Sequence, residues 1–211
     1  MLVLGAVLGG VVGGAHAVGE QTAPAPGASS TGCAFDRARL LALDEHAFDQ
    51  DMAGGWRTLA EQPGCKLVAA DLLRDYRQAH GNEAGLLYWH EAQLRAMAGQ
   101  SEAAIALMER SRRPAGKDKG GWNPYVDASI AFLRKDRAAL GKARQDLASV
   151  PYPDNPDMPP LKNGVVEMPM EGGTSMKMRW PPNIDVVDGF IGCFDKPYEV
   201  AYNNGCRPPA P

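Results

Sequence analysis

Four methionines near the C-terminal end of this 211-residue chain form two pairs with the same spacing, Met168-x-Met170 and Met176-x-Met178. Residues two apart in a strand point to the same face of a sheet. The segment between the pairs, EGGT at 171–174, is typical of a hairpin turn, so we expect four thioethers on one face of a β-hairpin. Thioethers suit Cu(I), and a soft-metal site is one hypothesis for this segment. The simpler alternative is an apolar face that packs on the rest of the protein, because methionine fills irregular gaps.

His90-Glu91 begins like the helical zinc motif of metalloproteases, which requires a second histidine four residues later. Position 94 is leucine, so we interpret His90 as packed in or beside a helix interface. The sequence also lacks a Gly-x-Ser-x-Gly elbow, a phosphate-binding glycine-rich loop and a dinucleotide fingerprint. The expectation is therefore a protein that is not an enzyme and has no cofactor, with an enzyme lacking any recognisable motif as an alternative.

The cysteine count is even, which in an exported protein predicts two disulfides. We favour Cys33–Cys65, because in an antiparallel helix pair the start of the first helix lies beside the end of the second. We favour Cys193–Cys206, because the turn Asn203-Asn204-Gly205 can fold the tail back. No Cys-x-x-Cys spacing occurs, which disfavours a metal site built on cysteine.

The first 17 residues predict export. Residues 2–14 are apolar and uncharged, and Ala15-His16-Ala17 provides the small residues that signal peptidase requires. No basic residue precedes the apolar run, so a retained membrane anchor is the alternative. Residues 18–32 are small, polar and proline-containing, which predicts a disordered leader before the folded body. The expected location is the periplasm or the cell exterior.

Charge and hydropathy narrow the classes of partner. The formal net charge is −3, and no basic stripe occurs, so nucleic-acid binding is not expected. No later apolar run is long enough to span a bilayer, so stable membrane insertion after signal cleavage is not expected either. The oligomeric state does not follow from the sequence.

Residues 33–150 predict one α-helical domain. Apolar residues recur at helical spacing between glycine and proline breaks. The expected helices cover about 34–47, 56–62, 66–79, 83–98, 101–112, 124–134 and 137–149.

Small residues recur at fixed places in the stretch 85–112: Ala92 and Ala104 in its two helices, Gly99 in the turn and Ser111 near the end. In these positions the stretch resembles one tetratricopeptide repeat, an antiparallel helix pair that stacks with its neighbours. The resemblance implies a tandem array of helix hairpins.

The stretch 122–149 resembles the same repeat only in part. Its turn at Lys135-Asp136 follows Gly99-Gln100 by 36 residues, close to the period of about 34 residues. It departs from the pattern with lysine in place of the turn glycine and with Leu140 where a small residue is usual.

Arrays of this family curve and offer a concave groove, so the resemblance implies a protein or peptide as partner. The function expected is that of a binding or scaffold module. The residues implied for the groove lie on the first helix of each pair: Tyr88, Gln93, Arg95, Tyr125 and Asp127. With only two recognisable pairs, the C-terminal hairpin can instead cap the array and leave a mostly structural role.

Residues 151–206 predict a C-terminal element packed on the helical domain. It begins with a proline-dense segment, continues through the methionine hairpin and enters a helix at about 184–194. Residues 207–211 are expected to form a disordered tail. The expected fold is mainly α, with tandem antiparallel helix hairpins, a small β-hairpin and a disulfide-stapled C-terminal helix.

Overall fold

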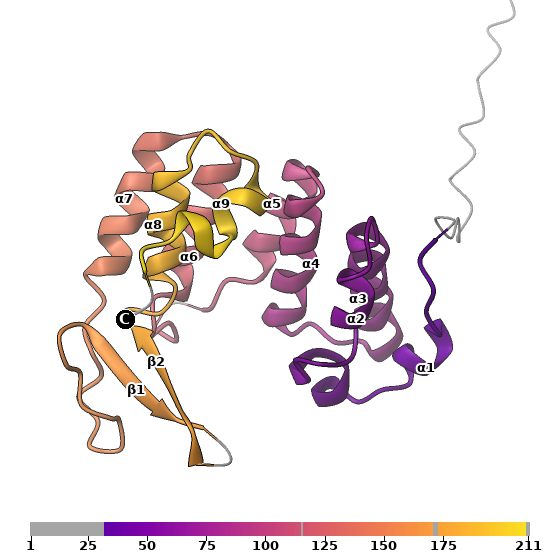
Figure 1. Cartoon of the computed structure of the whole chain (residues 1–211), viewed down its shortest axis with the longest axis horizontal. Helices are drawn as coiled ribbons and strands as arrows, with labels where there is room; N and C mark the ends of the chain where they lie inside the picture. Colours follow the sequence, from indigo (N-terminus) through magenta and orange to yellow (C-terminus); the bar gives the residue numbers. More distant parts are fainter. Residues whose placement is uncertain (1–31, 115, 171–172, 210–211) are drawn as a thin grey trace, which may run out of the picture.

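The computed structural model describes residues 32–114, 116–170 and 173–209 (Figure 1). The predicted signal peptide at 1–17, most of the predicted leader at 18–32 and the end of the predicted tail at 210–211 lie outside the described residues. The described chain is mainly helical and carries one two-stranded antiparallel sheet near its C-terminal end. This confirms the predicted fold class.

The N-terminal part consists of short helical segments followed by one long helix. These are α1 (Arg37–Leu41), the π-helical turn η1 (His46–Gln50), α2 (Arg57–Ala60) and α3 (Lys66–His80). The single helix expected over 34–47 is wrong. The carboxylate of Asp44 accepts a hydrogen bond from the backbone N–H of Ala47 at 2.8 Å and so starts a new turn. An aspartate that bonds the backbone locally competes with continuation of a helix.

Two antiparallel helix pairs follow. The first joins α4 (Gly85–Met97) to α5 (Ser101–Arg110), and the second joins α6 (Trp122–Leu133) to α7 (Arg137–Ala148). Gly99 in the first turn has a φ of +80°, a conformation that favours glycine. Ala92 and Ala104 are fully buried between the helices, as their small size allows.

The C-terminal part adds a hairpin and two helices. Strands β1 (Val165–Pro169) and β2 (Ser175–Arg179) pair antiparallel, with Met168 opposite Met176. The hairpin extends below α6, α7 and the C-terminal helices in the view of Figure 1. Helix α8 (Ile184–Gly192) then packs on α6 and α7, and α9 (Tyr198–Tyr202) leads into a 3₁₀ turn at Asn204–Cys206.

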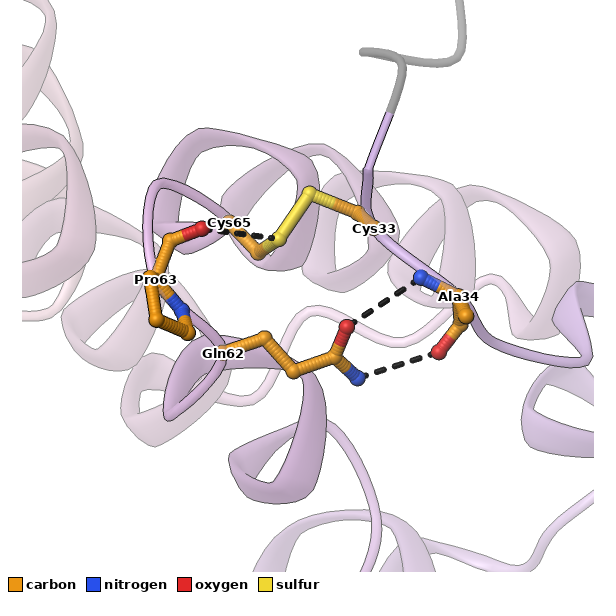
Figure 2. The surroundings of a disulfide bond; sticks show 5 residues. All are labelled: Cys33, Ala34, Gln62, Pro63 and Cys65. Carbon is orange, nitrogen blue, oxygen red and sulfur yellow. Dashed lines mark hydrogen bonds between the residues drawn. A yellow bond between two sulfur atoms is a disulfide. The ribbon is translucent and has the colours of Figure 1, made fainter.

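Both predicted disulfides are confirmed. Cys33–Cys65 has a Cα–Cα distance of 5.7 Å, and Cys193–Cys206 one of 5.9 Å. Figure 2 shows that the side-chain amide of Gln62 bonds both backbone groups of Ala34, at 3.1 and 3.0 Å. The chain at Cys33 is therefore held beside the end of α2 by two hydrogen bonds as well as by the disulfide.

The buried apolar residues form two clusters. One gathers side chains of α1, η1, α2 and α3, and the other gathers those of α4 to α9. Helix α4 belongs to both, because Leu87 and Leu94 enter the first cluster while Trp89 and Ala92 enter the second. It is therefore the structural link between the two halves of the described chain.

Candidate functional site

A buried carboxylate joins three elements of the N-terminal half. Asp49 on η1 is fully buried, and its Oδ1 accepts a hydrogen bond from the indole N–H of Trp56 at 2.8 Å. The Nδ1 atom of His90 on α4 lies 2.6 Å from the same oxygen. The guanidinium of Arg57 donates to the backbone carbonyl of Asp49. The arrangement holds η1 and the start of α2 against α4.

The electrostatics of this carboxylate follow from its partners. Burial by itself raises the pKa of Asp49, but the hydrogen bond and positive charge of His90 and the hydrogen bond of Trp56 outweigh it, so the pKa lies below its usual value. Asp49 therefore remains ionised, and an ionised carboxylate orients the imidazole through Nδ1. An Asp–His pair is one half of a nucleophile-activating arrangement.

A second polar group lies between α3 and α4. Arg77 and Glu91 form a buried ion pair, and Arg95 donates to the other oxygen of Glu91 at 2.8 Å. Arg95 also forms an ion pair with Asp71 at 2.8 Å. The guanidinium of Arg77 also lies 3.7 Å from the ring centre of Tyr88. These charges are paired with one another within the fold, which is the usual requirement for burying them.

The structure does not bring the five expected groove residues together on one open face. Tyr88 and Tyr125 are buried, and Arg95 is occupied in the ion pairs just described. Asp127 is exposed but pairs with Arg112 at 2.7 Å, toward α5. Gln93 is half-buried beside Tyr198.

Helix α9 lies against the first helix of the first pair. It contacts α4, and the buried Tyr198 lies against the side chains of Gln93 on α4 and Ser129 on α6. Lys66 at the start of α3 forms an ion pair with Glu199 at 3.1 Å. The C-terminal segment thus covers the side of α4 and α6 on which Gln93 and Ser129 lie.

The hairpin has two chemically different faces. Met168 and Met176 are directly opposite each other, and Val166 is opposite Met178 on the same face. Since side chains alternate along a strand, Met170 continues this face, which we call the methionine face. Met170 and Met176 are 48% and 47% exposed, whereas Val166 is buried. The other face carries charge, with Glu167 opposite Lys177.

The hydrogen bonds across the hairpin show which backbone groups point outward. Trp180 donates to the carbonyl of Gly164, and Met170 donates to that of Thr174. In an antiparallel pair the bonded positions alternate with positions whose N–H and C=O point away from the partner strand. Ser175, Lys177 and Arg179 of β2 are therefore outward-facing, and so is Pro169 of β1, which has no N–H to lose.

A cleft of about 490 Å³ lies along this outer side of β2. One wall is the strand itself, and the opposite wall includes Arg207 and Pro209 of the C-terminal segment. Arg179 donates to the carbonyl of Pro209 at 2.8 Å, and Arg207 is held by the carbonyl of Tyr202 and by Asp185. We call this feature the edge cleft. Part of the segment expected to be a disordered tail therefore forms its wall.

The described residues offer limited chemistry outside these features. All four cysteines are in disulfides. Within residues 32–114, 116–170 and 173–209, no three His, Cys, Asp or Glu side chains are grouped so that they could hold a metal ion. The same residues contain no helix that combines the length and the apolar character required to cross a bilayer.

Fold and site together define a class: a mainly helical, disulfide-bonded protein of packed antiparallel helix pairs that carries an exposed two-stranded hairpin. Comparison with protein-family models, with curated proteins and with solved structures finds no match to this chain.

Sequence reasoning missed both the buried carboxylate and the edge cleft. Asp49 lies 41 residues from His90, and no local pattern connects them. The edge cleft depends on a tail that folds back beside β2. Pro169 marks a position of β1 whose N–H points away from the ladder, but it lies on the other strand and gives no signal for the cleft beside β2.

Proposed function

We propose that this protein is an exported, non-catalytic binding module that takes up an extended segment of another protein at the edge cleft. The observation that carries the proposal is the open edge of β2. The sheet of the described residues has two strands only, and the outward positions Lys177 and Arg179 line the edge cleft. An extended peptide can add to such an edge through main-chain hydrogen bonds.

Charge favours one kind of segment. Lys177, Arg179 and Arg207 line the edge cleft, and Asp185 is the one acidic residue in its lining. Met176 and Met178 supply apolar surface at the same place. A strand that alternates acidic and apolar residues fits both features, because alternate side chains of an added strand point to opposite faces.

The helical part serves as the scaffold in this proposal. We infer that α4/α5 and α6/α7 are related to tetratricopeptide repeats. The left-handed Gly99 and the buried Ala92 and Ala104 support that relation. Since α9 covers the side of α4 on which Gln93 lies, the proposed partner site is the edge cleft rather than a groove between the helices.

Export is part of the proposal. Disulfides persist in oxidising compartments, and this chain has two, between residues 32 and 13 apart in the sequence. A periplasmic or extracellular location fits this chemistry, and the partner would be met there.

The test uses two fluorescent peptides of alternating sequence, one of valine and glutamate and one of valine and lysine, with binding measured by anisotropy. We expect the acidic peptide to bind more tightly, with an affinity that falls as salt rises. Lys177→Pro removes an outward N–H without touching the bonds between β1 and β2, as Pro169 already does in β1. It should weaken binding by about tenfold or more.

The matched control is Lys177→Gln, which removes the charge but keeps the N–H. It should retain most of the affinity for the acidic peptide at high salt. Equal losses in the proline and glutamine variants would contradict strand addition at this edge, and equal binding of both peptides would contradict the preference for an acidic segment.

A further inference from the structure

The methionine face is only partly buried. At the base of the hairpin Val166 is buried, and Met178 beside it is half-buried. Toward the turn the face opens to solvent, where Met170 and Met176 are each about half exposed. Burial therefore accounts for the base of this face and leaves its outer part unexplained.

The register brings the thioethers close together. Met168 and Met176 occupy a hydrogen-bonded pair, for which the Cα atoms lie about 5.5 Å apart. Met170 and Met178 are their neighbours two residues along each strand, on the same face. Each side chain has three rotatable bonds, so the sulfur atoms can converge above the sheet.

The described residues offer no free thiol that would compete for a soft metal. A thiolate would bind such an ion more strongly, but all four cysteines are in disulfides. No grouping of three His, Cys, Asp or Glu side chains suited to a metal occurs in the described parts of the chain. The charged pair of Glu167 and Lys177 lies on the opposite face of the hairpin.

We infer that Met168, Met170, Met176 and Met178 form a binding site for Cu(I). The inference goes beyond the proposed function, because it uses side chains of the methionine face rather than the backbone edge of β2. Copper enters already reduced, and binding forms Cu–S bonds to neutral thioethers. No electron is transferred and no proton is released.

The experiment titrates the full disulfide-bonded protein with Cu(I) under anaerobic conditions against a colorimetric chelator. We expect one Cu(I) per chain, bound more tightly than micromolar. The double variant Met168→Leu/Met176→Leu keeps the apolar volume, and such swaps are well tolerated. It should bind Cu(I) about tenfold more weakly or worse.

Met52 provides the matched control. It is 76% exposed and lies far from the hairpin in the sequence, so Met52→Leu should leave Cu(I) affinity unchanged. Methyl NMR of the wild type should show copper-dependent shifts for the four methionines of the face and none for Met52. Because a thioether has no proton to lose, the affinity should not weaken between about pH 8 and pH 5, unlike that of a histidine or thiolate site.

Three results would each overturn the inference: no binding tighter than micromolar, an equal loss in the Met52 variant, or an unchanged affinity in the double variant. The titration contains no peptide, so failure of Cu(I) binding is distinguishable from failure of peptide binding at the edge of β2, even though Met176 and Met178 contribute to both features.

Discussion

At the scale of single residues, the carboxylate of Asp49 has partners at the start of α2 and on α4. It accepts from Trp56 and lies 2.6 Å from Nδ1 of His90. Asp49→Asn keeps an acceptor for Trp56 but removes the negative charge that faces His90. We expect a loss of about 1–3 kcal/mol in the free energy of unfolding at neutral pH, measured by urea denaturation.

The same variant makes a prediction about pH. The pKa of Asp49 lies below its usual value of 3.8 in the folded protein. Its stabilisation is therefore present above that pH and is lost as pH falls through the folded-state pKa. The difference between wild type and Asp49→Asn should shrink in this acid range. Asp154→Asn, at an exposed position, is the control and should show no comparable difference at neutral pH. A gap that persists unchanged at low pH would contradict the proposed role of the charge.

Whether a contact between two residues could be predicted depends on how far apart they lie in the sequence. The packed His90 could be predicted, because its local pattern excludes the zinc motif and leaves a helix-interface histidine. Its partner could not, since Asp49 lies in a loop-like π-helical turn that the helical pattern over 34–47 conceals. Packing decides which residues far apart in the sequence pair with each other, and the local periodicity of a sequence carries no information about that packing.

At the scale of elements, the turn between α6 and α7 contains a lysine in a backbone conformation that favours glycine. Lys135 has a φ of +56°, in the left-handed region that glycine adopts without cost. Its Nζ donates to the carbonyls of Phe194 and Lys196 at 2.8 and 3.1 Å. The side chain thus ties this turn to the segment after α8, and the two bonds offset the backbone cost.

Two substitutions at this turn separate the backbone cost from the hydrogen bonds. Lys135→Ala loses the bonds and keeps the left-handed residue, whereas Lys135→Gly loses the bonds and relieves the backbone. We expect the glycine variant to be more stable than the alanine variant by about 1 kcal/mol in urea unfolding. Gly99→Ala is the matched control. Its φ is +80° and a Cβ there would meet no heavy atom within 4 Å, so it should cost a similar amount. Equal stability of the two Lys135 variants would show that the turn changes its conformation.

Helices and strands could be predicted where apolar residues recur at a regular spacing between clear turn signals. The helices from α3 to α7 lie within a few residues of their expected positions, because glycine or proline marks most of their boundaries and Lys135-Asp136 marks the turn between α6 and α7. The hairpin was predictable from alternation and its turn. The contact of α9 with α4 could not be predicted, because it depends on how the segment joined by Cys193–Cys206 folds back.

At the scale of the whole molecule, the two apolar clusters share one helix. Leu94 of α4 packs in the N-terminal cluster and Ala92 in the C-terminal one, and the ion pair between Lys66 and Glu199 joins α3 to α9. Each cluster is also closed by its own disulfide. Loss of order in one half should therefore expose the α4 surface on which the other half depends.

This arrangement predicts that removing one disulfide weakens both halves. A disulfide stabilises the fold mainly by restricting the unfolded chain, and Cys33–Cys65 joins residues 32 apart in the sequence. The double variant Cys33→Ser/Cys65→Ser should therefore lower the free energy of unfolding by about 3–4 kcal/mol. Hydrogen exchange followed by mass spectrometry should show faster exchange in α3 and, by a comparable factor, in α8 of the distant cluster. The reciprocal variant, Cys193→Ser/Cys206→Ser, should speed exchange in α3 as well. If each variant instead affected only its own cluster, the halves would unfold separately, and α4 would be a spacer between two units rather than the helix on which both depend.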